Sequence, residues 1–230
     1  MQESDELDTE LDKRDFGNWL HQLLKLFHDA LQRSPASDPQ ARQTLIDTAA
    51  DQATLALGLS SSEFLPFAAS WPRLRAGYLA WLAAHEASGA SYDEGEAWRE
   101  MALGVLTLVG KIDRIDRLTD GSALLIDYKT EAAGTTAQRI KLGLEDSQLA
   151  FYAALLSDDT LAAAYLNVAE KEGSKSYRQD HIVDLRDQLI EGIVTDMTRI
   201  AEGHSMAALG EGRACEFCAA RGLCRKDFWT

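Results

Sequence analysis

The stretch "LLIDYKTEAA" (residues 124–133) decides how this sequence is interpreted, because an apolar run ends there in two charged side chains. Residues 124–126 predict a buried strand, and Asp127 and Lys129 follow it on either side of Tyr128. Side chains two positions apart on a strand point to the same side of the sheet. The stretch therefore predicts a carboxylate beside an ammonium group at a strand end, either as a solvated ion pair or as part of an active site.

The preceding segment supplies a second carboxylate. "GKIDRID" (110–116) predicts a strand, and "LTDGSA" (118–123) contains an Asp-Gly turn signal, so the two strands should form a hairpin with Asp113 beside Asp127. Two converging carboxylates suit Mg²⁺ or Mn²⁺, and such a cation polarises a phosphodiester and acidifies a water. Lys129 could orient that water or stabilise charge on the phosphate. A one-residue slip in the hairpin would turn Asp113 away.

The remaining pattern predicts an N-terminal set of helices followed by a mixed α/β core. Apolar residues recur at helical spacing from Phe16 to Leu31. A helix from Ser70 towards Ala84 would carry Pro72 in its first turn, and Asp146 or Ser147 would cap a later helix. The other expected elements are a helix over 40–57, a polar linker over 86–96, strands over 98–118, 161–170 and 176–183, and helices over 145–156 and 185–202.

Three motifs in this order resemble the nuclease motifs of the RecB family within the PD-(D/E)XK superfamily: "GKIDRID", "IDYKT" and "QLAFY" (148–152). The resemblance implies that Asp113, Asp127 and Lys129 are catalytic. It also implies that Gln148 and Tyr152, one helical turn apart, contact the DNA backbone or support the lysine. The fold implied is a restriction-endonuclease-like mixed sheet flanked by helices, with an N-terminal helical part and a Cys-containing C-terminal tail.

The first predicted helix extends the resemblance. "FGNWLHQLL" (16–24) is similar to the family's Gly-x-x-x-His helix, which implies that His21 is a metal ligand together with Asp113 and Asp127. His28, two turns further on, is expected at the surface. The family often has a glutamate before its first aspartate, and Glu96 and Glu100 are both candidates. The resulting division is a helical part over residues 1–90, a nuclease core over 91–205 and a Cys-rich tail over 206–230.

The tail carries all three cysteines, Cys215, Cys218 and Cys224, in a C-x₂-C-x₅-C pattern. The pattern resembles the C-terminal part of the iron–sulfur box of AddB-type and CRISPR-associated nucleases. A [4Fe–4S] cluster needs four thiolates, and no cysteine precedes residue 215, so the cluster is expected to be incomplete here. We therefore expect a fragment of a longer protein that begins after the first ligand. Zinc held by the three cysteines and His204, or free thiols, are the alternatives.

Charge and composition limit the possible partners. The 230-residue chain has a net charge of −14, which argues against binding nucleic acid mainly by neutralising phosphates. A local basic track could still form. Its expected members are Lys111, Arg114, Arg117, Arg139, Lys141, Arg221, Arg225 and Lys226. No apolar run approaches the ~20 residues of a membrane span, and the acidic N-terminus is not a signal peptide, so the expected compartment is the cytoplasm.

Together these features predict a Mg²⁺- or Mn²⁺-dependent DNA nuclease, in context an exonuclease of double-strand-break repair. A helicase-like region of a parent chain and a helicase–nuclease partner subunit would deliver the DNA. Two alternatives stay open. One is a catalytically silent iron–sulfur scaffold for DNA binding or subunit assembly, and the other is a metal-binding α/β protein that does not act on nucleic acid.

Overall fold

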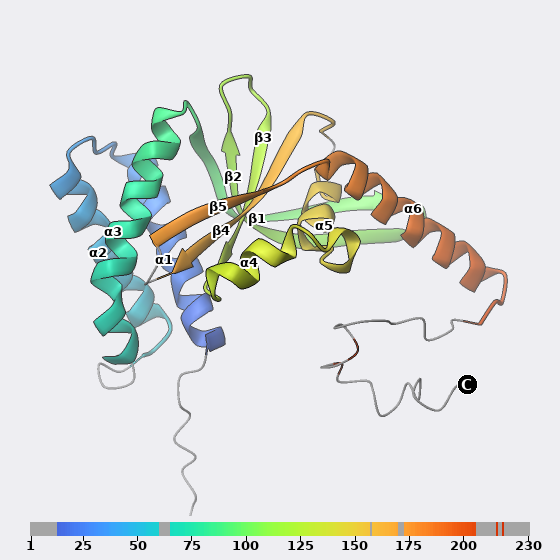
Figure 1. Ribbon diagram of the computed structural model, residues 1–230, viewed down its shortest axis with the longest axis horizontal. Helices are drawn as coiled ribbons and strands as arrows, with labels where there is room; N and C mark the ends of the chain where they lie inside the picture. Colours follow the sequence, from blue (N-terminus) through green and yellow to red (C-terminus); the bar gives the residue numbers. More distant parts are fainter. Residues whose placement is uncertain are drawn as a thin grey trace, which may run out of the picture.

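The computed structural model describes residues 13–59, 65–156, 158–169 and 173–205, together with residues 215 and 218. In these parts of the chain, helices cover both faces of one five-stranded sheet (Figure 1). The elements in chain order are α1 (Lys13–Arg33), α2 (Pro39–Ala56), α3 (Leu65–Ala87), β1 (Ser91–Leu103), β2 (Leu106–Arg117), β3 (Ala123–Lys129), α4 (Ala133–Arg139), the 3₁₀ helix η1 (Gly143–Glu145), α5 (Gln148–Ala154), β4 (Leu161–Ala169), β5 (Gly173–Gln179) and α6 (Ile182–Ala201).

The sheet has the order β1-β2-β3-β4-β5 and mixes strand directions. Strands β1, β2 and β3 form an antiparallel meander, β3 and β4 are parallel, and β5 is antiparallel to β4. A parallel pair needs a crossover connection, which here contains α4 and α5. Strand β3 is central, and every residue from Ala123 to Tyr128 is buried. This arrangement confirms the predicted restriction-endonuclease-like class of fold.

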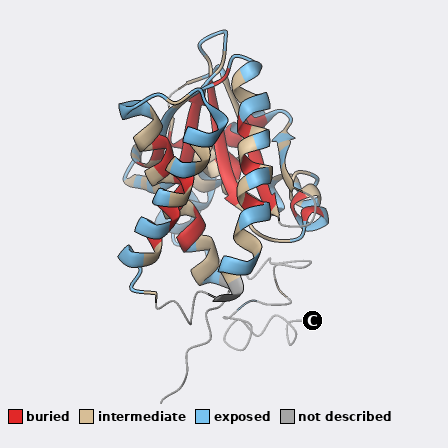
Figure 2. Ribbon diagram, turned by 90° about the vertical axis from the view of Figure 1, so that its left-hand side faces the viewer, coloured by how far each residue is buried: buried red, intermediate tan, exposed pale blue. Residues whose placement is uncertain are grey.

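Two hydrophobic cores hold the helices to the sheet. On one face, Trp19 and Phe27 of α1 pack in the same cluster as Ile126 of β3. On the other face, Leu149 of α5 packs with Leu125 of β3. Figure 2 shows the buried strands behind helices whose outer sides are exposed. Each fully buried side chain of this size stabilises the fold by about 1.5–3 kcal/mol, so the sequence of β3 and the apolar stripe of α1 fix their mutual position.

Two elements begin earlier in the chain than predicted, and one predicted N-cap residue lies at its expected position. Strand β1 begins at Ser91, inside the stretch expected to be a linker, because an edge strand tolerates charged side chains such as Asp93 and Glu94. Helix α3 begins at Leu65 and carries Pro72 in its interior. Ser147 occupies the N-cap position of α5, but its side chain makes no capping hydrogen bond.

The C-terminal tail lies mostly beyond the described parts of the chain. Cys224 is outside them, whereas Cys215 is half-buried, Cys218 is exposed, and both are free of disulfide bonds. The division of the chain at residues 90 and 205 stays a prediction. Among the described residues, no helix combines the length and apolar character that crossing a membrane requires.

Candidate metal and catalytic site

The β2–β3 hairpin brings two carboxylates to adjacent strands. Arg114 pairs with Ile126, so the next residues outward, Asp113 and Asp127, lie opposite each other. Both carboxylates are buried, and Asp113 Oδ2 accepts a hydrogen bond of 2.9 Å from the backbone N–H of Tyr128. The register is therefore the one that the Asp-Gly turn predicted, and the slipped alternative does not occur.

Helix α1 and strand β1 complete the group. His21 Nδ1 lies 3.4 Å from Asp113 Oδ1 and 3.5 Å from Glu96 Oε1. One ligand atom from each of these three residues lies within 4.8 Å of the others. The side chain of Glu100 is elsewhere, because it accepts a hydrogen bond from Trp98 Nε1. Of the two candidate glutamates, the structure brings Glu96 to the histidine and the aspartate.

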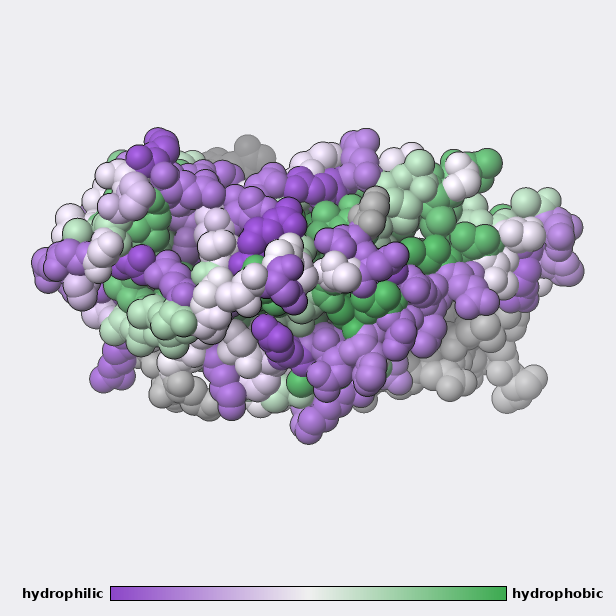
Figure 3. Space-filling model, turned by 90° about the horizontal axis from the view of Figure 1, so that it is seen from above, coloured by the Kyte–Doolittle hydropathy of each residue, from purple (hydrophilic) through white to green (hydrophobic). Residues whose placement is uncertain are grey.

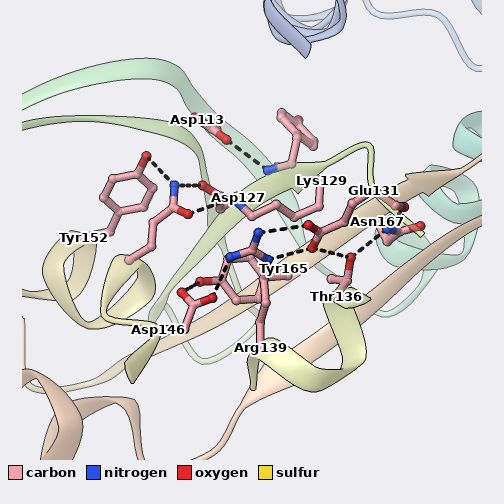
Figure 4. Close-up of polar contacts among 12 residues, drawn as sticks. Asp113, Asp127, Lys129, Glu131, Thr136, Arg139, Asp146, Tyr152, Tyr165 and Asn167 are labelled. Carbon is pink, nitrogen blue, oxygen red and sulfur yellow. Dashed lines mark hydrogen bonds and ion pairs between the residues drawn. The ribbon is translucent and has the colours of Figure 1, made fainter. Parts of the chain in front are cut away.

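Helix α5 positions the lysine. Lys129 Nζ donates to Gln148 Oε1 at 2.7 Å and lies 2.6 Å from Asp127 Oδ2 (Figure 4). Gln148 Nε2 in turn donates to Asp127 Oδ1 at 2.5 Å and to the hydroxyl of Tyr152 at 3.3 Å. One glutamine thus holds the relative position of the carboxylate and the ammonium group.

A family model of the PD-(D/E)XK nuclease superfamily matches residues 1–225. The chain belongs to the PD-(D/E)XK nuclease superfamily. A solved structure titled "Crystal structure of SSO0001" is 15% identical, with a TM-score of 0.39, and the match covers 91% of this chain and 96% of that one. A search of curated proteins gave no match.

Burial and charge set the protonation of this PD-(D/E)XK site. Burial lowers the pKa of His21, but the carboxylates of Asp113 and Glu96 more than offset this effect and raise it to about 10. Burial, together with the charge of Asp113, raises the pKa of Asp127 to about 7, although Lys129 acts in the opposite direction. Without a metal ion, His21 is therefore an imidazolium between the carboxylates of Asp113 and Glu96. A bound cation would replace its proton as their positive partner, because a metal-ligating histidine must be neutral.

The donor atoms fit a hard divalent cation. Glu96 Oε1 and Asp127 Oδ2 are buried, and neither accepts a hydrogen bond of good geometry from a described residue. Their nearest positive groups are His21 Nδ1 at 3.5 Å and Lys129 Nζ at 2.6 Å, respectively. Cations such as Mg²⁺ take carboxylate oxygens of this kind, and a neutral imidazole is a ligand for transition metals. PD-(D/E)XK nucleases use divalent metals, and His21, Glu96 and Asp113 could hold one, with Asp127 adjacent.

A second polar cluster beside the lysine was missed in the sequence. Lys129 Nζ lies 5.1 Å from the ring centroid of Tyr165, whose hydroxyl donates to Asp146 Oδ1 at 2.7 Å. Arg139 donates to both carboxylate oxygens of Glu131 and to Asp146 (Figure 4). The available signal was the position of Glu131, two residues after Lys129 and just past the end of β3. The cluster ties the end of β3 to the segment that leads into α5.

Two residues expected at the surface are in the core. His28 is 2% exposed and stacks on Tyr92 with ring centroids 4.5 Å apart. Arg114 is 1% exposed and donates to Asp116 Oδ1 at 2.7 Å and to the Tyr78 hydroxyl at 2.9 Å. A buried guanidinium requires such partners, so polar groups from α1, α3 and β1 gather around it.

The predicted basic track is therefore interrupted. Arg114 is buried, Arg139 is paired with two carboxylates, and the ammonium group of Lys111 pairs with Glu96. Arg117 pairs with Asp93 at 2.9 Å, while Lys141 is exposed. The three basic residues of the tail, Arg221, Arg225 and Lys226, lie outside the described residues. Most of the expected cations on the described part of the track already have acidic partners.

Proposed function

We propose that this PD-(D/E)XK domain is a Mg²⁺- or Mn²⁺-dependent deoxyribonuclease. His21, Glu96, Asp113 and Asp127 would hold the cation, and Lys129 would serve the attacking water or the phosphate. The observation that carries the proposal is the convergence of His21, Glu96 and Asp113 from α1, β1 and β2, with Asp127 of β3 opposite Asp113.

Each side chain has a separate task in phosphodiester hydrolysis. A bound cation supplies Lewis acidity towards phosphate oxygens and makes a water more acidic. Lys129 is largely buried, and its ammonium group would face the phosphate on which negative charge develops in the transition state. A donor that is already oriented in this way lowers the barrier to hydrolysis. Gln148 keeps the ammonium group in place, and Tyr152 fixes the amide of Gln148.

The finer assignment rests on the motif order. The spacing of "GKIDRID", "IDYKT" and "QLAFY" after a Gly-x-x-x-His helix supports a RecB-family domain similar to the C-terminal nuclease domain of AddB-type proteins. Exonuclease action in double-strand-break repair follows from that assignment, as do a cytoplasmic location and an incomplete [4Fe–4S] site at Cys215, Cys218 and Cys224. The interrupted basic track supports weak, salt-sensitive intrinsic DNA affinity, which suits a strand delivered by a helicase-like region or partner subunit.

Linear and covalently closed circular DNA, each incubated at low salt with Mg²⁺ or Mn²⁺, test this proposal. The expected result is metal-dependent loss of the linear DNA, with circular DNA intact and with no loss in an Asp113→Ala variant of unchanged circular dichroism. Cleavage of both forms would retain the nuclease and exclude strict exonuclease action. Intact linear DNA under all conditions would favour the silent scaffold.

A further inference from the structure

An exposed tryptophan stands beside the candidate metal site. Among the described residues, the exposed large hydrophobic side chains include several aliphatic groups but only one aromatic, Trp98, which is 58% exposed. It lies on β1, two residues after Glu96, and pairs with Lys111 of β2. Directly paired residues on antiparallel strands have Cβ atoms about 4.5–5.5 Å apart on one face. The ammonium group of Lys111 pairs with Glu96, so Trp98 adjoins the metal-ligand group through a single lysine.

The indole is oriented but not covered. Trp98 Nε1 donates to Glu100 Oε1 at 3.1 Å, which fixes one edge of the ring. Within the described parts of the chain, no other ring stacks on it and no cation lies over it. Farther along the hairpin, Val109 is 45% exposed and Val105 is 96% exposed. Seen from above, apolar surface gathers on the half of the molecule that carries the end of this hairpin and α6 (Figure 3).

We infer that Trp98 and Lys111 form a subsite for an unpaired nucleotide of a single-stranded DNA substrate, with the base stacked on the indole and a phosphate near the lysine. Aromatic stacking binds bases of any identity, and it requires a base face that a duplex does not offer. The ammonium group of Lys111 pairs with Glu96, but its side chain is 55% exposed, so a phosphate can approach it from the solvent side. This inference rests on the proposed function for the class of substrate.

A protein partner would use the hairpin differently. Aliphatic side chains such as Val105 and Val109 contribute most where a partner covers the whole apolar surface. A base stacks on the aromatic ring alone, next to the phosphate that is to be cleaved. The position of Trp98 beside Glu96, rather than at the tip of the hairpin, favours the nucleotide.

Oligonucleotide binding in the presence of EDTA separates the subsite from cleavage. Trp98→Ala should weaken binding of a single-stranded oligonucleotide by about five- to a hundred-fold, the range for loss of one base–aromatic stack. Duplex affinity should change less than twofold. Trp98→Phe should retain most of the affinity. The oligonucleotide should quench the tryptophan fluorescence of the wild type but not that of Trp98→Phe, which keeps the four other tryptophans. Val109→Ala is the matched control, with unchanged affinity.

Each other outcome has a defined meaning. Equal affinities of Trp98→Ala and wild type for single strands would overturn the inference, and so would equal losses in Trp98→Ala and Val109→Ala. A change in oligomeric mass in Trp98→Ala, with oligonucleotide affinity retained, would identify the hairpin as a protein contact and also overturn it. Binding through Trp98 without any metal-dependent cleavage would support the subsite while the proposed hydrolysis fails.

Discussion

Replacement of the buried arginine tests how the helices and the sheet are joined. Arg114 donates to Asp116 at 2.7 Å and to Tyr78, lies 2.7 Å from His28 Nε2, and its guanidinium lies 5.4 Å from the ring centroid of Trp81. Arg114→Met fills a similar volume but removes the charge from a site that is 1% exposed. Asp116, itself fully buried, would then lose its guanidinium partner.

The expected cost follows from these contacts. Removing one member of a buried ion pair destabilises a protein by about 3–5 kcal/mol, because the other charge is left buried. His85 Nε2 lies 2.7 Å from Asp116 Oδ2, so the carboxylate keeps one hydrogen-bond partner and the lower end of that range applies. We expect a loss of about 3 kcal/mol in the free energy of unfolding. For a chain of this size, that loss lowers the melting temperature by about 6–12 °C.

Urea unfolding followed by circular dichroism measures this loss, with Arg117→Met as the matched control three residues along the same strand. Arg117 is about half exposed and pairs with Asp93, so its replacement should cost less than about 1 kcal/mol. Equal, small losses in both variants would refute the reasoning. If Arg114 instead contacted DNA at the surface, Arg114→Met would leave the free energy of unfolding unchanged and would reduce the salt dependence of oligonucleotide binding.

Three further changes have defined outcomes. Burial and the charge of Arg114 lower the pKa of His28 well below its ordinary value. The free energy of unfolding should therefore decline as the pH falls below about 6.5, because the unfolded chain then binds a proton that the buried ring does not. Urea unfolding at several pH values should show a weaker decline in His28→Gln. A Cβ added at Gly17 in α1 meets no atom within 4 Å, so Gly17→Ala should raise the free energy of unfolding by about 0.5–1 kcal/mol; destabilisation would contradict the open space. Gln148→Ala should lower kcat about 10- to 100-fold, because Gln148 orients Lys129 and Asp127. Oligonucleotide affinity should stay unchanged, and a wild-type kcat would show that Lys129 needs no such support.

The hairpin at the centre of the site could be predicted because local signals agree there. The Asp-Gly turn sets the register, and the apolar run of β3 demands burial on both faces, so Asp113 and Asp127 have one way to meet. The position of His21 had no such local signal. It depended on the resemblance, because nothing in the spacing of α1 tells which strand lies beneath it.

Other parts of the site were hidden by their polar character. Glu96 was one of two candidate glutamates, and the sequence did not distinguish it from Glu100 because Glu96 lies in a stretch that predicts a linker. Its backbone adopts a φ of +51°, a conformation that is uncommon outside glycine. His28 and Arg114 are charged or polar types that usually lie at the surface. Their burial depends on Tyr78 and Asp116, which are distant or unremarkable in the sequence, so only the packed structure shows that the four residues satisfy one another.

Single-turnover cleavage of linear DNA by the wild type and by Lys129→Ala, with Mg²⁺ and then with EDTA, tests the central claim most directly. Lys129 holds no cation in this account, so the variant should keep its fold and its metal affinity while losing cleavage by at least about a hundredfold, the cost of removing one oriented charge-stabilising donor. The wild type should cleave with Mg²⁺ and stop with EDTA. Cleavage by Lys129→Ala at the wild-type rate, or cleavage by the wild type in EDTA, would contradict the account.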